Sequence, residues 1–184
     1  ETRMMKHPFD QSLVRIRSAK PSASEQLTEK LASRDIPFSV MIELTVKCNL
    51  RCLHCYNYDR SSSMPASLKQ EMTPDEVYRV IDEAVAEGCF HFSFTGGEAL
   101  LNPHLLDFIK YARSHHSRVH LKTNGTLLNE RNIQDYADAG VENIWVSLYG
   151  SNAATHDAFT AKPGSFDATI HASKLVVSHG MKLD

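Results

Sequence analysis

FHFSFTGGEALLNPHLLDFIKYARSHHSRVHLK, residues 90–122, places two short alternating segments on either side of a helix-like segment. In FHFSF (90–94) and RVHLK (118–122), apolar and polar residues alternate, which is typical of strands. Between them, NPHLLDFIKYARSHH (102–116) predicts an amphipathic helix that is capped by Asn102 and Pro103. A strand, a helix and a second strand in succession predict a parallel βαβ unit with a right-handed crossover.

The alternation of strands and helices continues on both sides of this unit. Further strands are expected at FSVMIELT (38–45), ENIWVSL (142–148) and MKLD (181–184), and further helices at 73–88, about 129–139 and 164–180. Thr73, Pro74 and Glu76 predict a capped start for the first of these helices, and Gly88 its end. The pattern predicts an α/β fold, a partial TIM-like (β/α) barrel of parallel strands truncated at about the fifth strand. An open doubly wound sheet is the alternative.

The predicted strands have two different faces. One face is apolar: Val40, Ile42, Leu44, Phe90, Phe92, Phe94, Val119, Leu121, Ile144, Val146 and Leu148. The other face is mostly polar and includes Glu43, His91, Ser93, His120, Lys122, Trp145 and Ser147. Parallel strands buried on both faces are usually apolar on both. We therefore expect helices over the apolar face and a binding cavity on the polar one, the alternative being a polar face in bulk water. Glu43 is expected to hydrogen-bond at the cavity rim or to pair with Lys122.

Each strand runs into a distinctive loop. The loops are TVKCNLRCLHCY (45–56), TGGEAL (95–100), TNGTLL (123–128) and YGSNAATHD (149–157). Ligands of βα folds bind beyond the carboxyl ends of the strands, so these four loops are expected to converge on one rim.

Three of the four cysteines lie in the first of these loops, as CxxxCxxC. The three thiolates of Cys48, Cys52 and Cys55 are one short of a closed tetrahedral zinc site and suit a [4Fe–4S] cluster with one open iron. A zinc site completed by His54 is the alternative that the spacing allows. Cys89 has no cysteine nearby and is expected to be a buried, inert thiol.

Composition narrows the class of protein. The 184 residues are 42% hydrophobic and 23% charged, enough for an ordinary core without disulfides, and four cysteines indicate a reducing, cytoplasmic setting. A net charge of −2 predicts no strong attraction to nucleic acid or to a membrane surface, and no apolar run reaches membrane-spanning length. Residues 1–37, with a possible strand LVRIR (13–17) and a helix starting near Ser22, are expected to be a lead-in or appendage to a barrel domain at 38–184.

CNLRCLHCY, TGGE, TNGTLL and VSL, in this order, resemble the radical S-adenosylmethionine (radical SAM) enzymes over residues 38–184. CNLRCLHCY and SLYGSNAATHDAFTAKPGSFDATI are most similar to the SPASM-associated maturases, which modify peptides or assemble cofactors. The resemblance implies that Cys48, Cys52 and Cys55 hold three irons of a [4Fe–4S] cluster and that the fourth iron binds S-adenosylmethionine. It implies further cofactor contacts from His54, Tyr56, Gly96, Gly97, Glu98, Thr123, Asn124 and Ser147, with Glu98 receiving the ammonium group of the ligand.

The resemblance also implies a reaction. A flavodoxin- or ferredoxin-type reductant would supply an electron, S-adenosylmethionine would be cleaved reductively, and the 5′-deoxyadenosyl radical would take a hydrogen atom from a substrate, expected to be a peptide. A radical SAM enzyme of small-molecule cofactor biosynthesis, of molybdopterin or haem-d1 type, and a non-enzymatic iron–sulfur or zinc module are the alternatives. No residue is assigned a catalytic role. Because the family barrel usually has six βα units, we expect this chain to be part of a longer protein and to be inactive alone.

Overall fold

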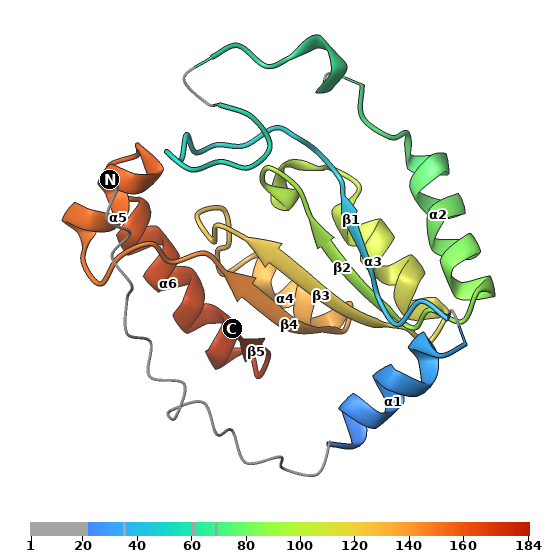
Figure 1. The fold of residues 1–184 in the computed structure, drawn as a ribbon. Coiled ribbons are helices and arrows are strands. Elements are labelled where there is room, and N and C mark those ends of the chain that lie inside the picture. The colour runs from blue at the N-terminus through green and yellow to red at the C-terminus, as the bar shows by residue number, and fades with distance from the viewer. Residues whose placement is uncertain (1–21, 35, 60–61, 69) are drawn as a thin grey trace, which may run out of the picture. The chain divides into compact units, whose positions relative to one another are not determined.

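A parallel five-stranded sheet forms the centre of residues 36–184 in the computed structural model, which describes residues 22–34, 36–59, 62–68 and 70–184. The strands are β1 (Val40–Glu43), β2 (His91–Thr95), β3 (Arg118–Thr123), β4 (Val141–Val146) and β5 (Lys182–Leu183). They lie side by side in chain order, and every neighbouring pair is parallel (Figure 1). A doubly wound sheet would reverse its strand order part-way. The predicted partial TIM-like barrel is therefore confirmed.

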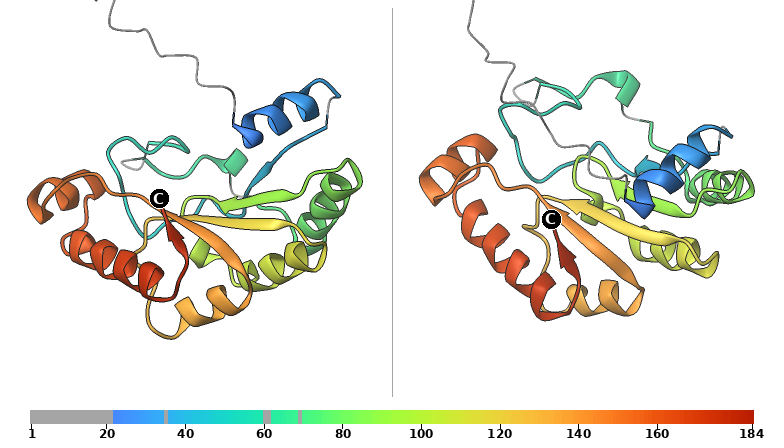
Figure 2. Two further views of the ribbon diagram at one scale, coloured as in Figure 1. Left: turned by 90° about the horizontal axis from the view of Figure 1, so that it is seen from below. Right: turned by 60° about the horizontal axis from the view of Figure 1, so that its bottom comes forward.

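Helices cover one side of this sheet. They are α2 (Pro74–Ala86), α3 (Leu105–Ser114), α4 (Asn132–Asp138) and α6 (Ser165–Ser178), and Figure 2 shows all four on the same side. Between them and the sheet lies the core, in which Phe92, Phe94, Leu121 and Ile144 are fully buried. The apolar face predicted for the strands is the helix-covered face, with one exception. Leu148 is 51% exposed because β4 ends at Val146 and Leu148 lies in the loop beyond.

The start of α2 follows its sequence signals. Thr73 accepts a hydrogen bond from the Glu76 amide, and the Glu76 carboxylate accepts one from the Thr73 amide, which completes the predicted capping box. Gly88 follows α2 with φ +90°, a left-handed conformation that favours glycine. In the separate unit Glu1–Asp35, Ser22 and Glu25 form the same box at the start of α1 (Ala23–Ala32). The strand predicted at 13–17 lies outside the described residues.

The prediction that Asn102 caps the third helix is wrong. A turn of 3₁₀ helix, η3 (Ala99–Leu101), follows the GGE loop, so α3 begins only at Leu105, after His104. The Asn102 side chain instead accepts a hydrogen bond from the His104 amide and donates one to the carbonyl oxygen of Leu44. Asn102 therefore links this turn to the segment that leaves β1.

The loop predicted at 149–157 contains the start of a helix. This is α5 (Ala153–Thr160), and the Asn152 side chain caps it by accepting a hydrogen bond from the Thr155 amide. Another short 3₁₀ helix, η2 (Ala66–Leu68), precedes α2. Cys89 is buried, as predicted, with its sulfur 3.4 Å from the carbonyl oxygen of His91. Within the described ranges, no helix has the length and apolar character needed to span a membrane.

Candidate cofactor site

A cavity of about 310 Å³ opens at the carboxyl ends of β1 to β4. All of the predicted site residues except Glu98 line it: Cys48, Cys52, His54, Cys55, Tyr56, Gly96, Gly97, Thr123, Asn124 and Ser147. Tyr149, which the sequence analysis did not single out, lines it as well. The structure thus brings the four loops together at one rim, where ligands of βα folds bind.

The three clustered cysteines are half-buried, and none forms a disulfide. The Leu50 amide donates to the Cys48 sulfur (3.4 Å), and Asn124 Nδ2 lies 3.8 Å from the same atom. N–H donors aimed at a sulfur stabilise the thiolate, the form that binds metals. In the part of the chain that the structure describes, no three His, Cys, Asp or Glu side chains are arranged around one metal position. The residues fit an iron–sulfur cluster through their donor set and the cavity that all three thiols line.

The cysteine loop is held by the C-terminal end of α5. The Arg51 amide donates to the carbonyl oxygen of Thr160 (3.1 Å), and the Leu53 amide donates to that of Phe159 (3.0 Å). These backbone hydrogen bonds join segments more than a hundred residues apart in the sequence. They give α5, the helix that the sequence analysis missed, a part in positioning the thiols.

Asn124 ties the end of β3 to the same loop. Its Nδ2 donates to Asn49 Oδ1 (2.9 Å), and its Oδ1 accepts from the Thr126 amide and hydroxyl (2.9 and 2.7 Å). Asn49 Nδ2 donates in turn to the Thr126 hydroxyl (2.8 Å). The side chain of Asn124 therefore forms both a local turn and a tertiary contact, and it is only 8% exposed.

Glu71, another residue that the sequence analysis missed, fixes the start of the loop. Its carboxylate accepts hydrogen bonds from the Thr45 hydroxyl (2.5 Å) and the Val46 amide (3.3 Å), and it pairs with Lys47 (3.5 Å). Burial acts to raise the pKa of Glu71, but these hydrogen bonds and the Lys47 charge outweigh it, so the pKa lies below its usual value. A single carboxylate between two predicted elements carries no sequence signal of this role.

The glycine pair allows two backbone segments to meet. The Gly97 amide donates to the carbonyl oxygen of Thr45 (2.6 Å), and the Glu98 amide donates to that of Lys47 (2.8 Å). A Cβ atom on Gly96 would overlap the Thr45 carbonyl oxygen, and one on Gly97 would overlap that of Lys47. In this structure the backbone of Gly96 and Gly97 therefore lies close against Thr45 to Lys47, the segment that leads into the cysteine loop.

Glu98 lies behind the cavity. Its side chain is 1% exposed, and its carboxylate accepts hydrogen bonds from the Leu100 amide (3.0 Å), the Thr123 hydroxyl (2.7 Å) and the Asn124 amide (2.8 Å). Burial raises the pKa of this carboxyl group, while the three donors act to lower it. In this structure the carboxylate is turned toward η3 and the end of β3, and its contact with an ammonium group of the ligand stays a prediction.

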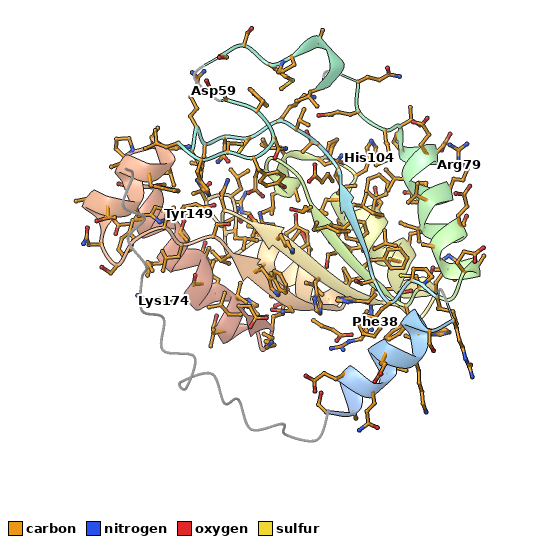
Figure 3. All side chains as sticks on the ribbon, in the orientation of Figure 1. Phe38, Asp59, Arg79, His104, Tyr149 and Lys174 are labelled. Atoms are coloured by element: carbon orange, nitrogen blue, oxygen red, sulfur yellow. The ribbon has the colours of Figure 1, made fainter. Side chains whose placement is uncertain are left out.

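Aromatic rings enclose His54. Its ring centroid lies 4.4 Å from that of Phe159 and 4.9 Å from that of Tyr149, and the Tyr149 and Phe159 rings lie 4.8 Å apart. Tyr149 lies beside α5, on the segment that leaves β4 (Figure 3), and its amide donates to the buried His156 ring (3.1 Å). Burial raises the pKa of Tyr149, and the nearby thiols add to this. His54 is thus a packed side chain that borders the cavity.

The open face of the sheet contributes the remaining groups. The Tyr56 hydroxyl donates to the Glu43 carboxylate (3.1 Å), so Glu43 orders the rim by a hydrogen bond, one of the two roles expected for it. Lys122 is not paired with Glu43 in the described residues; its ammonium group lies 4.2 Å from the centre of the Trp145 ring. The Ser147 amide donates to the carbonyl oxygen of Thr123 (3.1 Å), which joins the ends of β3 and β4 beneath the cavity.

The sequence profile of the radical SAM superfamily matches residues 42–183, which include every residue that lines this cavity except Met41. The chain belongs to the radical SAM superfamily. The relatives found are of two kinds, enzymes that make heme and enzymes that mature peptides.

The AdoMet-dependent heme synthase of Methanosarcina barkeri is 39% identical over 140 residues, 76% of this chain and 39% of that protein. The mycofactocin maturase MftC of Mycolicibacterium smegmatis is 31% identical over 138 residues, 75% of this chain and 34% of that protein. The chain therefore spans between a third and two fifths of the length of these relatives.

Among solved structures, native anSMEcpe with bound AdoMet superposes with a TM-score of 0.68 at 21% identity, over 80% of this chain and 43% of that one. At this identity the likeness shows the fold alone, that of a partial radical SAM barrel.

Proposed function

We propose that the chain is the cofactor-binding part of an enzyme that cleaves S-adenosylmethionine reductively and takes a hydrogen atom from a substrate. The observation that carries this is the convergence of Cys48, Cys52 and Cys55 on the cavity that the glycine pair also lines. When bound, a [4Fe–4S] cluster supplies the electron for this cleavage. We assign the barrel domain to residues 38–184 and residues 1–37 to a lead-in or appendage.

In this proposal the residues of the chain bind, orient and shield. The three thiolates hold the cluster, and the amide of Leu50 with that of the Asn124 side chain stabilises the Cys48 sulfur. Gly96, Gly97, Thr123, Asn124 and Ser147 line the remaining space, where S-adenosylmethionine would bind. The rings of His54 and Tyr149 border this space and exclude water from one side of it. No side chain is assigned a proton-transfer step.

A zinc site completed by His54 is less well supported. The His54 ring packs between Tyr149 and Phe159, and swinging it out to ligate a metal would break both ring contacts. Each such contact contributes about 0.5–1.5 kcal/mol.

The substrate that the comparisons favour is a tetrapyrrole on the way to a heme cofactor. The chain is 39% identical to the Methanosarcina heme synthase and 31% identical to the peptide maturase MftC over nearly the same length. This supports cofactor biosynthesis, the alternative in the sequence analysis, over peptide modification. We also propose a cytoplasmic enzyme that receives its electrons from a flavodoxin- or ferredoxin-type protein.

Iron and sulfide content tests the cluster assignment. After anaerobic reconstitution, we expect about four irons and four sulfides per chain. Cys52→Ser should remove most of this iron, whereas Cys89→Ser, which alters the buried thiol outside the cavity, should retain it. Stoichiometric zinc without sulfide, or full iron in the Cys52→Ser variant, would contradict the proposal.

A further inference from the structure

A second cavity, of about 380 Å³, lies on the open face of the sheet next to the cofactor cavity. It is lined by Lys122, Trp145, Val146, Ser147 and Asp184. Lys122 and Ser147 line both cavities. A molecule in the second cavity would therefore lie directly beside one bound in the first.

Trp145 shares this second cavity with a carboxylate, that of Asp184. Asp184 accepts hydrogen bonds from Asn143 Nδ2 (2.5 Å) and Lys182 Nζ (2.9 Å). Lys182 balances the charge of Asp184, so the carboxylate leaves no uncompensated negative charge beside the ring. The Trp145 side chain is 41% exposed and gives the second cavity a flat apolar wall.

Lys122 supplies a positive charge at the boundary between the cavities. None of the ion pairs among the described residues includes it, and its ammonium group lies 4.2 Å from the centre of the Trp145 ring. Glu43, the other acidic side chain of this face, accepts a hydrogen bond from Tyr56. Burial and the neighbouring His91 lower the pKa of His120 to about 4, so this histidine adds no positive charge near neutral pH. Lys122 is thus a cation that a bound anion could approach.

We infer that Lys122 and Trp145 form a substrate subsite for the carboxylate of a flat, conjugated small molecule. The ammonium group of Lys122 would donate to the carboxylate, and the body of the molecule would lie along the Trp145 ring, beside the cofactor cavity. A charged donor and a carboxylate form one of the stronger hydrogen bonds in proteins, and an aromatic wall favours a planar partner. The inference rests on the proposed function, since it names the substrate class of that site.

Equilibrium binding tests the subsite without turnover. The longest chain that the gene encodes would be reconstituted anaerobically and titrated with iron coproporphyrin III, and in parallel with its fully esterified form in the same detergent. Binding would be followed by quenching of tryptophan fluorescence, and the part of the quenching that is lost in Trp145→Phe would be assigned to Trp145. Binding of S-adenosylmethionine and formation of 5′-deoxyadenosine would be measured separately on each variant.

We expect Lys122→Gln to weaken binding of the free acid about tenfold and to leave binding of the ester unchanged. Lys122→Arg should restore most of the affinity for the acid. Lys110→Gln, an exposed lysine of α3 on the helix-covered side, is the matched control and should bind the acid like the unaltered protein.

Three results would overturn the subsite. They are no saturable binding of the acid to the unaltered protein, an equal loss for acid and ester in Lys122→Gln, and a loss confined to S-adenosylmethionine. The last would assign Lys122 to the carboxylate of the cofactor. In each case formation of 5′-deoxyadenosine by the unaltered protein reports on the proposed function independently.

Discussion

Replacing Glu98 with alanine should destabilise the protein through the sheet. The change removes the acceptor of three buried hydrogen bonds, from the Leu100 amide, the Thr123 hydroxyl and the Asn124 amide. Each buried donor left without a partner costs about 1–3 kcal/mol, and relief of the buried charge offsets part of the sum. We expect a net loss of about 3 kcal/mol in the free energy of unfolding. Glu98→Gln, which keeps one acceptor oxygen, should lose about 1 kcal/mol.

Urea unfolding followed by circular dichroism would measure both variants beside the unaltered protein. Glu87→Ala, at the exposed C-terminal end of α2, is a matched control and should shift the free energy by less than about 0.5 kcal/mol. The reasoning would be refuted if Glu98→Ala unfolded like the unaltered protein yet bound S-adenosylmethionine more weakly. That result would support the ligand contact that the family resemblance predicts for Glu98.

Three further predictions concern the same site. Gly97→Ala would press a Cβ atom into the Lys47 carbonyl oxygen. It should therefore lower the free energy of unfolding by about 1–3 kcal/mol and lower the iron retained after reconstitution. Normal stability and iron content in this variant would count against this packing. The pKa of His120, about 4 in the folded protein, lies below its unfolded value of 6.5, so its contribution to stability is complete above pH 6.5 and is lost as the pH falls toward 4. The melting temperature should therefore depend less on pH across this window in His120→Gln than in the unaltered protein. An unchanged slope of melting temperature against pH would argue against the lowered pKa of His120. Phe159→Ala removes a ring that packs on His54 and should lower the free energy of unfolding by about 1 kcal/mol in urea, whereas no change would show that the ring contact contributes nothing.

The fold could be predicted from the sequence because its signals are local. The Thr73 and Glu76 capping box, the glycine after α2 and the two-residue alternation of the strands each lie within a few residues and match the structure. The helix α5 was missed because its eight residues carry a weak apolar pattern. Its cap, Asn152, is a signal that could have indicated it.

The site could be predicted only in part, for a physical reason. The cysteines and the glycine pair lie in the loops that the strand order brings together, so their neighbourhood follows from the topology. The hydrogen bonds that link Glu98 to Thr123 and Asn124, and those of Glu71, span 24 to 26 residues, and those between the cysteine loop and α5 span more than a hundred. No local periodicity records such contacts, which is why the hydrogen bonds of Glu98 were not predicted and Glu71 and Tyr149 were not singled out.

Formation of 5′-deoxyadenosine tests the central claim most directly. The longest chain that the gene encodes, reconstituted anaerobically with iron and sulfide, would be incubated with S-adenosylmethionine and dithionite, beside Cys52→Ala. The account predicts 5′-deoxyadenosine and methionine in equal amounts from the unaltered protein and none from the variant, since one of the three thiolates that line the cavity is lost. A protein that carries its full cluster and forms no 5′-deoxyadenosine, or a Cys52→Ala variant that forms as much as the unaltered protein, would contradict it.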